Sequence, residues 1–408
     1  MMDTTRSQLS RRKFLSRSVG CLASASLIGL TPESGLGQDD TGENSSGDTD
    51  IIYRKLGKTG VSLPIVSMGV MNANNPNVVA ASYELGVRHF DSAAIYQYGR
   101  NEQMVGEVIN RLGVRDKVFI ATKTMRPEQR EGLNSDQMRD KLLEVIDGSL
   151  QRLKTDYVDL LYVHSVSVTG VASDPGLIDG MNTLKKQGKI RASGISTHRG
   201  MVEVIDDMIR AGAWDVVMAP INIGLASDDA LMTAIKRAAD SGLGVVAMKT
   251  QSGGRRLNPE VLARYDSTTM ATASLKWVLR HEHVHTAIPG YDNYEHMREC
   301  FSVVGNLEYT PEEKNLLSDD SIQLGMNYCH QCERCLASCP HSVDIPRLMR
   351  TYMYATAYGN AHEARTALSA GGAGNALRPC VSCDACVAEC VRSIDVPGRV
   401  SELKDIYG

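Results

Sequence analysis

The sequence predicts an α/β protein, a (β/α)₈ barrel of the TIM type followed by a small helical domain rich in cysteine. From Ile51 onward, short apolar runs alternate eight times with stretches of helical period. Continuous apolar strands are typical of parallel sheets, and eight strand–helix units favour closure into a barrel. Eight of the ten cysteines lie between Cys329 and Cys390, so a separate domain follows the barrel.

The elements follow in order along the chain. A hairpin is expected over 53–64, where Gly57 and Gly60 interrupt two short extended pieces. The eight predicted strands span 65–70, 87–93, 117–123, 157–164, 190–197, 215–222, 244–250 and 285–290. Clear helical patterns cover 101–112, 135–153, 230–242 and 272–280. An open, doubly wound sheet is the alternative, but no Gly-x-Gly-x-x-Gly follows the first strand.

The N-terminus predicts an export signal and not a folded element. "SRRKFL" (10–15) precedes a short, weakly apolar run and small residues, and Arg11-Arg12 resembles the twin-arginine form of such a signal. The alternative is a basic disordered tail. The apolar run is too short for a stable membrane span, so we expect none after signal removal. These features predict export by the twin-arginine route to the periplasm or another extracytoplasmic compartment.

The predicted domain boundaries follow from these patterns. They are a signal over 1–37, a disordered acidic linker over 38–50, the barrel over 51–310 and the cysteine domain over 322–408.

Composition limits the partners. The net charge is -4 and no basic stripe is present, which argues against nucleic acid. The scarcity of Phe and Trp, four and two residues, favours a polar small molecule such as a sugar.

Polar side chains stand where the predicted strands end, at the face where barrels carry their chemistry. They are Asp91, Lys123, His164, Ser196, Asn222, Lys249 and Gly290, with Tyr96 just beyond Asp91. Singly, each has an ordinary structural explanation. Four titratable groups on neighbouring strands together indicate a catalytic site.

Several segments resemble the aldo-keto reductase family: "FDSAAIYQYGRNEQMVGEVI", "FIATKT" and "YVDLLYVHS". The resemblance runs from about Tyr53 to Val304, and by motif position it implies a catalytic tetrad of Asp91, Tyr96, Lys123 and His164. The residues support the same roles. A tyrosine with an ordinary pKa of about 10 is a weak acid at neutral pH, and an adjacent ammonium lowers that pKa. Asp91 would hold Lys123 charged, and His164 could donate a hydrogen bond to a carbonyl oxygen.

The resemblance also implies a nicotinamide cofactor, because none of these side chains carries hydride. The positions that it implies for cofactor binding are Ser196, Thr197, Met248, Gly290, His296 and Glu299. Lys249, Gln251, Gly253 and Arg255 belong to a glycine-bearing loop with three cations, "KTQSGGRR", that suits a pyrophosphate, and the alternative is an ordinary exposed loop. Gly290 and His296 replace a Lys and an Arg that often hold the 2′-phosphate, so NADP and NAD both stay open. Met218 and Met248 replace a Gln and an aromatic residue that often contact the nicotinamide.

Two runs near the C-terminus share the spacing C-x₂-C-x₂-C-x₃-C. They comprise Cys329, Cys332, Cys335 and Cys339, then Cys380, Cys383, Cys386 and Cys390. This spacing is typical of two 4Fe-4S clusters, in which the fourth cysteine of each run serves the other cluster. Structural zinc is the alternative, but its CxxC units usually stand apart. The helical segment between the runs makes the region resemble an α-helical ferredoxin domain.

The sequence therefore predicts an exported NAD(P)-dependent oxidoreductase that interconverts a carbonyl and an alcohol, with Tyr96 as proton donor and acceptor and two appended clusters. The clusters would either relay electrons to a redox partner or be structural. The alternative function is an electron-transfer or interaction protein whose barrel binds but does not turn over a substrate.

Overall fold

The computed structural model describes residues 50–125, 127–225, 229–251, 263–319, 328–369, 375–383 and 385–408. The predicted signal, 1–37, lies outside these residues, and so does the predicted linker apart from Asp50.

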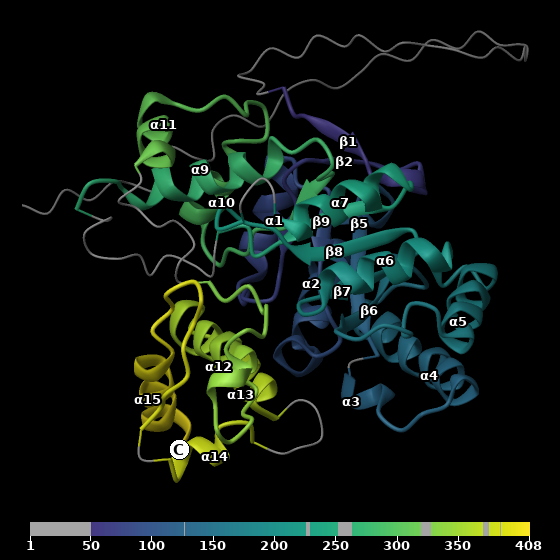
Figure 1. Ribbon diagram of the computed structural model, residues 1–408. Coiled ribbons are helices and arrows are strands. Elements are labelled where there is room, and N and C mark those ends of the chain that lie inside the picture. Colours follow the sequence, from purple (N-terminus) through teal and green to yellow (C-terminus); the bar gives the residue numbers. More distant parts are fainter. Residues whose placement is uncertain are drawn as a thin grey trace, which may run out of the picture. The chain divides into compact units, whose positions relative to one another are not determined.

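Eight parallel strands form the barrel, in the order in which they occur along the chain. They are β3 (Met68–Gly69), β4 (His89–Asp91), β5 (Phe119–Thr124), β6 (Val158–Val166), β7 (Ile190–Thr197), β8 (Val216–Pro220), β9 (Gly244–Met248) and β10 (Thr286–Ala287). Parallel bridges from Val66 to Ala287 and from Gly69 to Gly290 join the first strand to the last. The predicted (β/α)₈ barrel is therefore confirmed, and each predicted strand segment overlaps one of these strands (Figure 1).

Helices follow the strands around the barrel. They are α1 (Pro76–Leu85), α2 (Arg100–Leu112), α3 (Pro127–Arg130), α4 (Ser135–Leu153), α5 (Pro175–Lys186), α6 (Met201–Ala211), α7 (Ala230–Asp240), α9 (Ser267–Leu279) and α10 (Tyr294–Phe301). The predicted helix over 135–153 has the bounds of α4. Asn134 and Gln137 form a capping box at its start, and Lys154 ends it in a left-handed conformation.

The hairpin of β1 (Tyr53–Lys55) and β2 (Ser62–Pro64) covers the N-terminal end of the barrel. Leu56 and Leu63 pack into one cluster with inward-facing strand residues such as Leu160. The turn approaches the backbone that precedes β9, because Lys58 N donates to Gly242 O at 2.8 Å. Gly57 has φ +51°, and a Cβ there would lie 2.3 Å from Gly244 N.

Alternating side chains along the strands fill the barrel or face its helices. Phe119 and Ala121 on β5 point inward with Leu160 and Tyr162 on β6, while Ile120 and Leu161 join the core beneath the helices. The interior is thus packed solid, so chemistry is confined to the rim where the strands end.

The C-terminal region has a second core and is helical, as predicted. Its elements are α12 (Ile345–Tyr352), a π-helical turn η6 (Met353–Ala357), α13 (Ala361–Ser369), α14 (Arg378–Val381) and α15 (Val396–Tyr407). The repeat extends beyond the cysteines, since "HSVDIP" and "RSIDVP" follow the two runs. Asp344 and Asp395 in these segments cap α12 and α15, each with Pro in the first turn.

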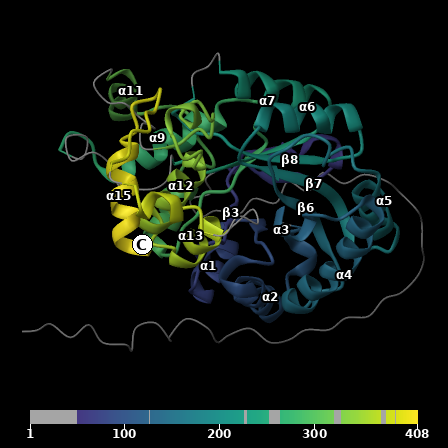
Figure 2. The same cartoon turned by 60° about the horizontal axis from the view of Figure 1, so that its bottom comes forward.

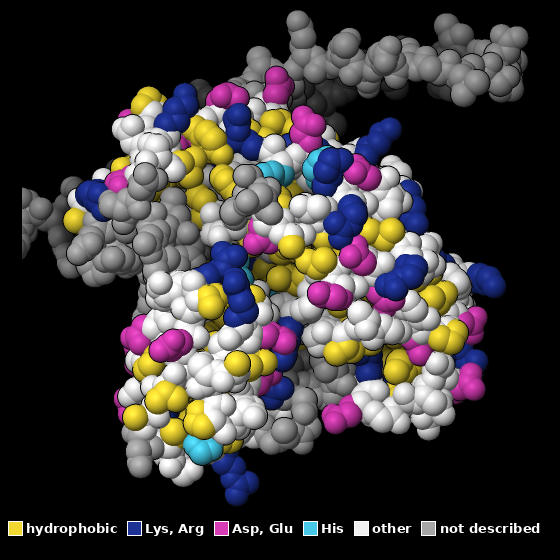
Figure 3. Space-filling model, in the orientation of Figure 1, with side chains coloured by type: hydrophobic (Ala, Val, Ile, Leu, Met, Phe, Trp, Pro, Cys, Tyr) yellow, Lys and Arg dark blue, Asp and Glu magenta, His cyan; other side chains and the backbone are white. Residues whose placement is uncertain are grey.

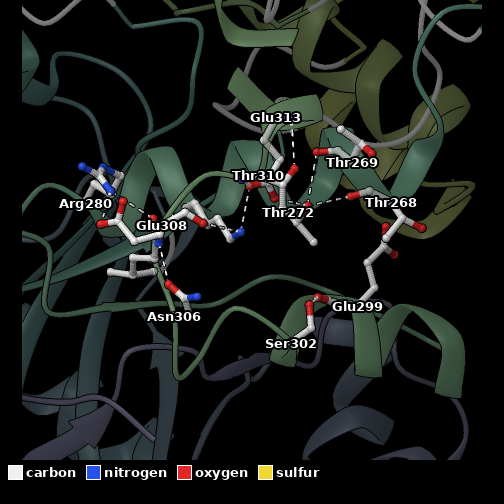
Figure 4. A network of polar contacts seen from close by, with 12 residues as sticks. Thr268, Thr269, Thr272, Arg280, Glu299, Ser302, Asn306, Glu308, Thr310 and Glu313 are labelled. Carbon is white, nitrogen blue, oxygen red and sulfur yellow. Dashed lines mark hydrogen bonds and ion pairs between the residues drawn. The ribbon is translucent and has the colours of Figure 1, made fainter. Parts of the chain in front are cut away.

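A polar network attaches α11 (Pro311–Ser318) to α9 (Figure 4). Glu313 accepts from Lys276 Nζ at 2.7 Å and from Thr272 Oγ1 at 2.6 Å, and all three side chains are buried. Although burial opposes it, these hydrogen bonds lower the pKa of Glu313. The network fixes the chain before it enters the cysteine domain.

No helix in the described ranges combines the length and apolar character needed to cross a membrane.

The hairpin provides a stability test. In Gly57→Ala the new Cβ would clash with backbone atoms. Gly60 also has a positive φ, +76°, but a Cβ added there would lie in open space. Gly60→Ala should cost only the left-handed penalty, about 1–2 kcal/mol. Gly57→Ala should cost about 1–3 kcal/mol more, because overpacking is added. Thermal unfolding of the two variants checks this, and equal melting temperatures would contradict the close approach.

Candidate active site

Four side chains meet at the C-terminal ends of three neighbouring strands. Asp91, Lys123 and His164 come from β4, β5 and β6, and Tyr96 comes from the 3₁₀ turn η3 (Tyr96–Gly99). All four line one cavity of about 220 Å³. The structure thus brings together the tetrad that the sequence pointed to.

Lys123 is the centre of this group. Its Nζ contacts Asp91 Oδ1, donates to Ser92 O at 2.7 Å, and donates to Tyr96 Oη at 3.4 Å. The rings of Tyr96 and His164 are nearly perpendicular, with centroids 6.2 Å apart. The phenol hydroxyl is therefore in reach of the ammonium group, and the imidazole of His164 lies beside the phenol ring in the same cavity.

Burial makes the charges in this site strongly interacting. Asp91 and Lys123 are each 2% exposed. Burial raises the pKa of Asp91, and the Lys123 ammonium opposes this rise. Below the pair, burial lowers the pKa of His89 to about 3, so this histidine is neutral. Lys123 is thus a buried cation, and its charge acts on Tyr96 with less screening than in water.

The backbone around the site is strained. Gln97 and Tyr98, directly after Tyr96, have φ of 51° and 59°. Met125, Ser165 and Lys249, at the ends of three strands, also have positive φ. Such conformations cost about 1–3 kcal/mol each and cluster at functional sites. Sequence reasoning missed this feature, because none of these residues is the Gly or Asn that usually marks it.

Hydrogen bonds hold the strained segments in place. Gln97 Nε2 donates to Met71 O and Ala73 O at 3.3 and 3.0 Å, and thereby fixes the turn that carries Tyr96. Arg130 binds Met125 O and donates to His164 O at 3.0 Å. Ser165 N donates to Ser196 Oγ at 3.0 Å. The site is therefore positioned before any ligand binds.

Most of the described residues predicted to bind a cofactor share this cavity. Ser196, Met248, Lys249, Gln251, Gly290 and His296 line it together with the tetrad. Thr197 and Glu299 are buried but are not part of its lining. Figure 4 shows Glu299 extending from α10 towards the beginning of α9. Gly253 and Arg255 lie outside the described residues.

The cavity wall fits a polar cofactor beside an apolar floor. Met218 and Met248 line it next to the Ser196 hydroxyl. Thr250 Oγ1 and His198 Nδ1 are buried in the same wall and have no hydrogen-bond partner in the described part of the chain. The pKa of His198 is lowered, mainly by burial and further by nearby cations, so this histidine is neutral. These groups can bind a ligand that brings its own polar atoms.

The cysteine domain supplies part of the same cavity, which sequence reasoning did not foresee. Tyr354, Ala357, Tyr358 and Glu363 line it opposite the strand ends. Lys249 Nζ donates to Tyr354 Oη at 3.1 Å and lies 4.5 Å from the centroid of that ring. Tyr354 belongs to η6, and π-helical turns often occur at functional sites.

Further contacts join the cysteine domain to the loops at this end of the barrel. Asn360 Nδ2 donates to Asn72 Oδ1 at 2.9 Å, and Figure 2 shows α13 grouped with α12 and α15 of the cysteine domain. Arg199, just after β7, contacts Glu333 and donates to Asp344 at 2.9 Å. Figure 3 shows a hollow where the C-terminal helices meet the barrel, with charged side chains at its rim. The domain is thus attached on two sides of the cavity.

The cysteines form two quartets drawn from both runs. Cys339 lines one small cavity of about 20 Å³ together with Cys380, Cys383 and Cys386. In the other quartet, Cys329 interacts electrostatically with Cys335, Cys390 and Cys332. None of the described cysteines forms a disulfide.

The quartets present four thiols each, which is the ligand set of a 4Fe-4S cluster. Burial raises the pKa of both Cys329 and Cys380 to about 11, so their thiolates need a compensating positive charge.

Comparison with known protein families agrees with this geometry. Residues 70–261 match the model of the aldo/keto reductase family, and residues 328–394 match that of the 4Fe-4S dicluster domain. The protein is therefore an oxidoreductase, with a barrel similar to the aldo/keto reductases and a C-terminal region similar to the 4Fe-4S dicluster domain.

Individual proteins are similar to about two thirds of the chain. An uncharacterized oxidoreductase, YqkF, from Bacillus subtilis is 26% identical over 66% of the chain and 96% of its own length. L-galactose dehydrogenase from Arabidopsis thaliana is 24% identical over 66% of the chain and 93% of its own length. The holo form of the aldo-keto reductase AKR11C1 from Bacillus halodurans shares the fold, with a TM-score of 0.54, 22% identity, and coverage of 65% of this chain and 95% of that one.

Proposed function

We propose that the protein interconverts a carbonyl compound and an alcohol, using NAD or NADP, with Tyr96 as the proton donor and acceptor. The observation that carries this proposal is the position of Lys123, whose ammonium group contacts both the buried Asp91 and the hydroxyl of Tyr96. A purely structural ion pair would not need a third, ionisable partner that faces the cavity.

The roles of the side chains follow from this contact. A bound nicotinamide supplies or accepts the hydride. The Lys123 ammonium donates to the phenol oxygen and so stabilises the tyrosinate, which makes Tyr96 a stronger acid. Asp91 keeps Lys123 charged and in place. His164 orients the carbonyl oxygen and stabilises the negative charge that develops there.

The substrate is proposed to be polar and sugar-like. The support is a cavity lined by many hydrogen-bonding groups, and a relative named L-galactose dehydrogenase. NADP is the expected cofactor from the family, but the choice between NADP and NAD rests on residues around His296 and outside the described ranges.

Tyr96→Phe tests the proton role. The variant keeps the ring and removes the hydroxyl, so turnover of an aldehyde panel should fall by about 10²–10⁴-fold. Binding of NADP⁺, followed by equilibrium dialysis, should be unchanged. Tyr53→Phe is the matched control, because this tyrosine belongs to the hairpin strand β1, does not line the cavity and is 49% exposed.

If wild type and Tyr96→Phe are equally inert although both bind the nucleotide, the enzyme proposal fails. The chain would then be an electron-transfer or interaction protein whose barrel binds ligands without turnover.

We also propose the ligand sets of the two clusters. Cys329, Cys332 and Cys335 with Cys390 hold one, and Cys380, Cys383 and Cys386 with Cys339 hold the other. The proximity of these thiols within each quartet supports the assignment. Clusters held in this way would supply one-electron chemistry. The clusters would either pass electrons to a redox partner outside the chain or have a structural role, which needs no such partner.

Paired substitutions test this crosswise assignment. Cys339→Ser with Cys383→Ser should damage a single cluster and leave about four of eight irons per chain. Cys339→Ser with Cys332→Ser should damage both clusters and leave little iron. Iron analysis and visible absorbance of anaerobically purified protein measure the result. Cys300→Ser is the control, since this thiol belongs to neither quartet. The opposite pattern would show that each run holds its own cluster.

Export by the twin-arginine route is proposed from Arg11-Arg12 and from the cysteines. That route moves folded proteins, so clusters and nucleotide can be inserted in the cytoplasm first. Substituting both arginines by Lys should leave the full-length chain in the cytoplasmic fraction of cells with that pathway, measured by immunoblotting. Unchanged export of the double variant would refute the proposal.

A further inference from the structure

A second chamber, of about 550 Å³, adjoins the first cavity at Lys123 and His164, which line both. The remaining barrel residues of its wall include Ile95 and Tyr98 beside the tetrad and Thr124 at the end of β5. None of the residues expected to bind the cofactor lines it, and Tyr96 lines the first cavity and not the chamber. A substrate that occupies the chamber must therefore extend past His164 to bring its carbonyl to Tyr96.

The opposite wall of the chamber is one face of α13. His362, Arg365, Thr366 and Ser369 line it, at positions i, i+3, i+4 and i+7 of the helix. This spacing places polar side chains in one stripe along a helix. The other face, with Ala364, Ala367 and Leu368, is buried in the cysteine domain. The stripe consists of a guanidinium, two hydroxyls and an imidazole.

The helix is held in register with the tetrad. The ring of His362 packs on Tyr98, with centroids 3.8 Å apart, and its Nε2 lies 3.1 Å from Ile95 O. Ile95 and Tyr98 flank the turn that carries Tyr96. The stripe and the proton donor are therefore fixed to the same loop, and a ligand between them meets a preorganised wall.

Arg365 is the cation of this wall. Within the described residues, no carboxylate lies within 4.0 Å of its guanidinium group. The guanidinium carbon lies over the ring of Tyr407, 6.0 Å from the ring centroid. The acidic residue nearest to it in sequence, Glu363, lines the first cavity instead. A guanidinium beside two hydroxyls matches the planar, bidentate geometry of a carboxylate.

We propose that this chamber holds one end of the substrate and that it selects carbonyl compounds that carry a carboxylate, the oxo acids. This inference rests on the proposed function. The carboxylate binds Arg365 and the Thr366 hydroxyl in the chamber, while the Ser369 hydroxyl donates to Arg365 O at 3.1 Å. The carbonyl extends past His164 to Tyr96 in the first cavity. In reduction, the carbonyl carbon gains a hydride from the nicotinamide and its oxygen gains the proton of Tyr96, which is replenished from solvent. The carboxylate is unchanged.

Two pairs of probes test the selection on the holoenzyme. Glucuronate is compared with glucuronamide, and succinate semialdehyde with butanal, so that each pair differs mainly in the charged group. Wild type should prefer the acid of at least one pair in kcat/KM. Arg365→Met should raise KM for that acid about 10- to 100-fold, the effect of losing a hydrogen bond between charged groups, and leave the neutral probe unchanged.

Matched variants separate recognition from general damage. Arg365→Lys keeps the charge without the fork geometry, so it should restore part of the preference. Arg111→Met removes an exposed arginine from the last turn of α2, far along the chain from the chamber, and should change nothing. A preference for neither acid in wild type overturns the proposal. So does an equal loss on acid and neutral probes in Arg365→Met.

Binding measurements keep this test independent of turnover. Equilibrium dialysis of labelled glucuronate and of NADP⁺ is made with Tyr96→Phe, with and without Arg365→Met. If Arg365→Met abolishes binding of glucuronate but not of NADP⁺, the result supports the carboxylate site. This holds even if the wild type turns over no substrate and the proposed function fails. Loss of NADP⁺ binding alone would assign Arg365 to a phosphate of the cofactor and overturn the proposal.

Discussion

The candidate site depends on one buried cation. Lys123 is 2% exposed, and an ammonium group at that depth is costly unless acceptors surround it. Asp91 and the carbonyl of Ser92 provide those acceptors, both from the end of β4, the strand beside β5. Register between these two strands is therefore a condition for the chemistry. A slip of one residue would turn Lys123 or Asp91 away from the barrel interior.

The barrel satisfies this condition by its construction. The hairpin and the inward-facing side chains fill the interior below Lys123, so water has little access from that side. The strained turns at Gln97, Tyr98 and Ser165 lie above it, where backbone hydrogen bonds and the cysteine domain hold them. Stability is thus concentrated in the strands and their helices. Strain is confined to the rim, where side chains must face a ligand.

The strands, the tetrad and the cysteine runs could be predicted from the sequence, because each depends on local pattern. Apolar runs mark β3 to β10, and Asp91, Lys123 and His164 follow from their position at strand ends. The walls of the two cavities could not be predicted. Tyr354 and Arg365 are far from Tyr96 along the chain, and they reach it only through the packing of a separate domain. Their spacing alone is that of an ordinary amphipathic helix.

Joining the two domains at the cavity ties the cysteines to the barrel chemistry. Tyr328 precedes Cys329 and packs in one buried cluster with Met353 and Tyr354, next to Met71 of the barrel. The conformation of the first cysteine run is thus linked, through two contacts, to the residue that binds Lys249. Metal sites of small domains commonly supply much of their folding free energy. If clusters bind as proposed, their insertion would order α12, η6 and α13, and with them the outer wall of both cavities. Cluster assembly and completion of the active site would then be one event, and under the proposed twin-arginine route it would precede export of the folded chain.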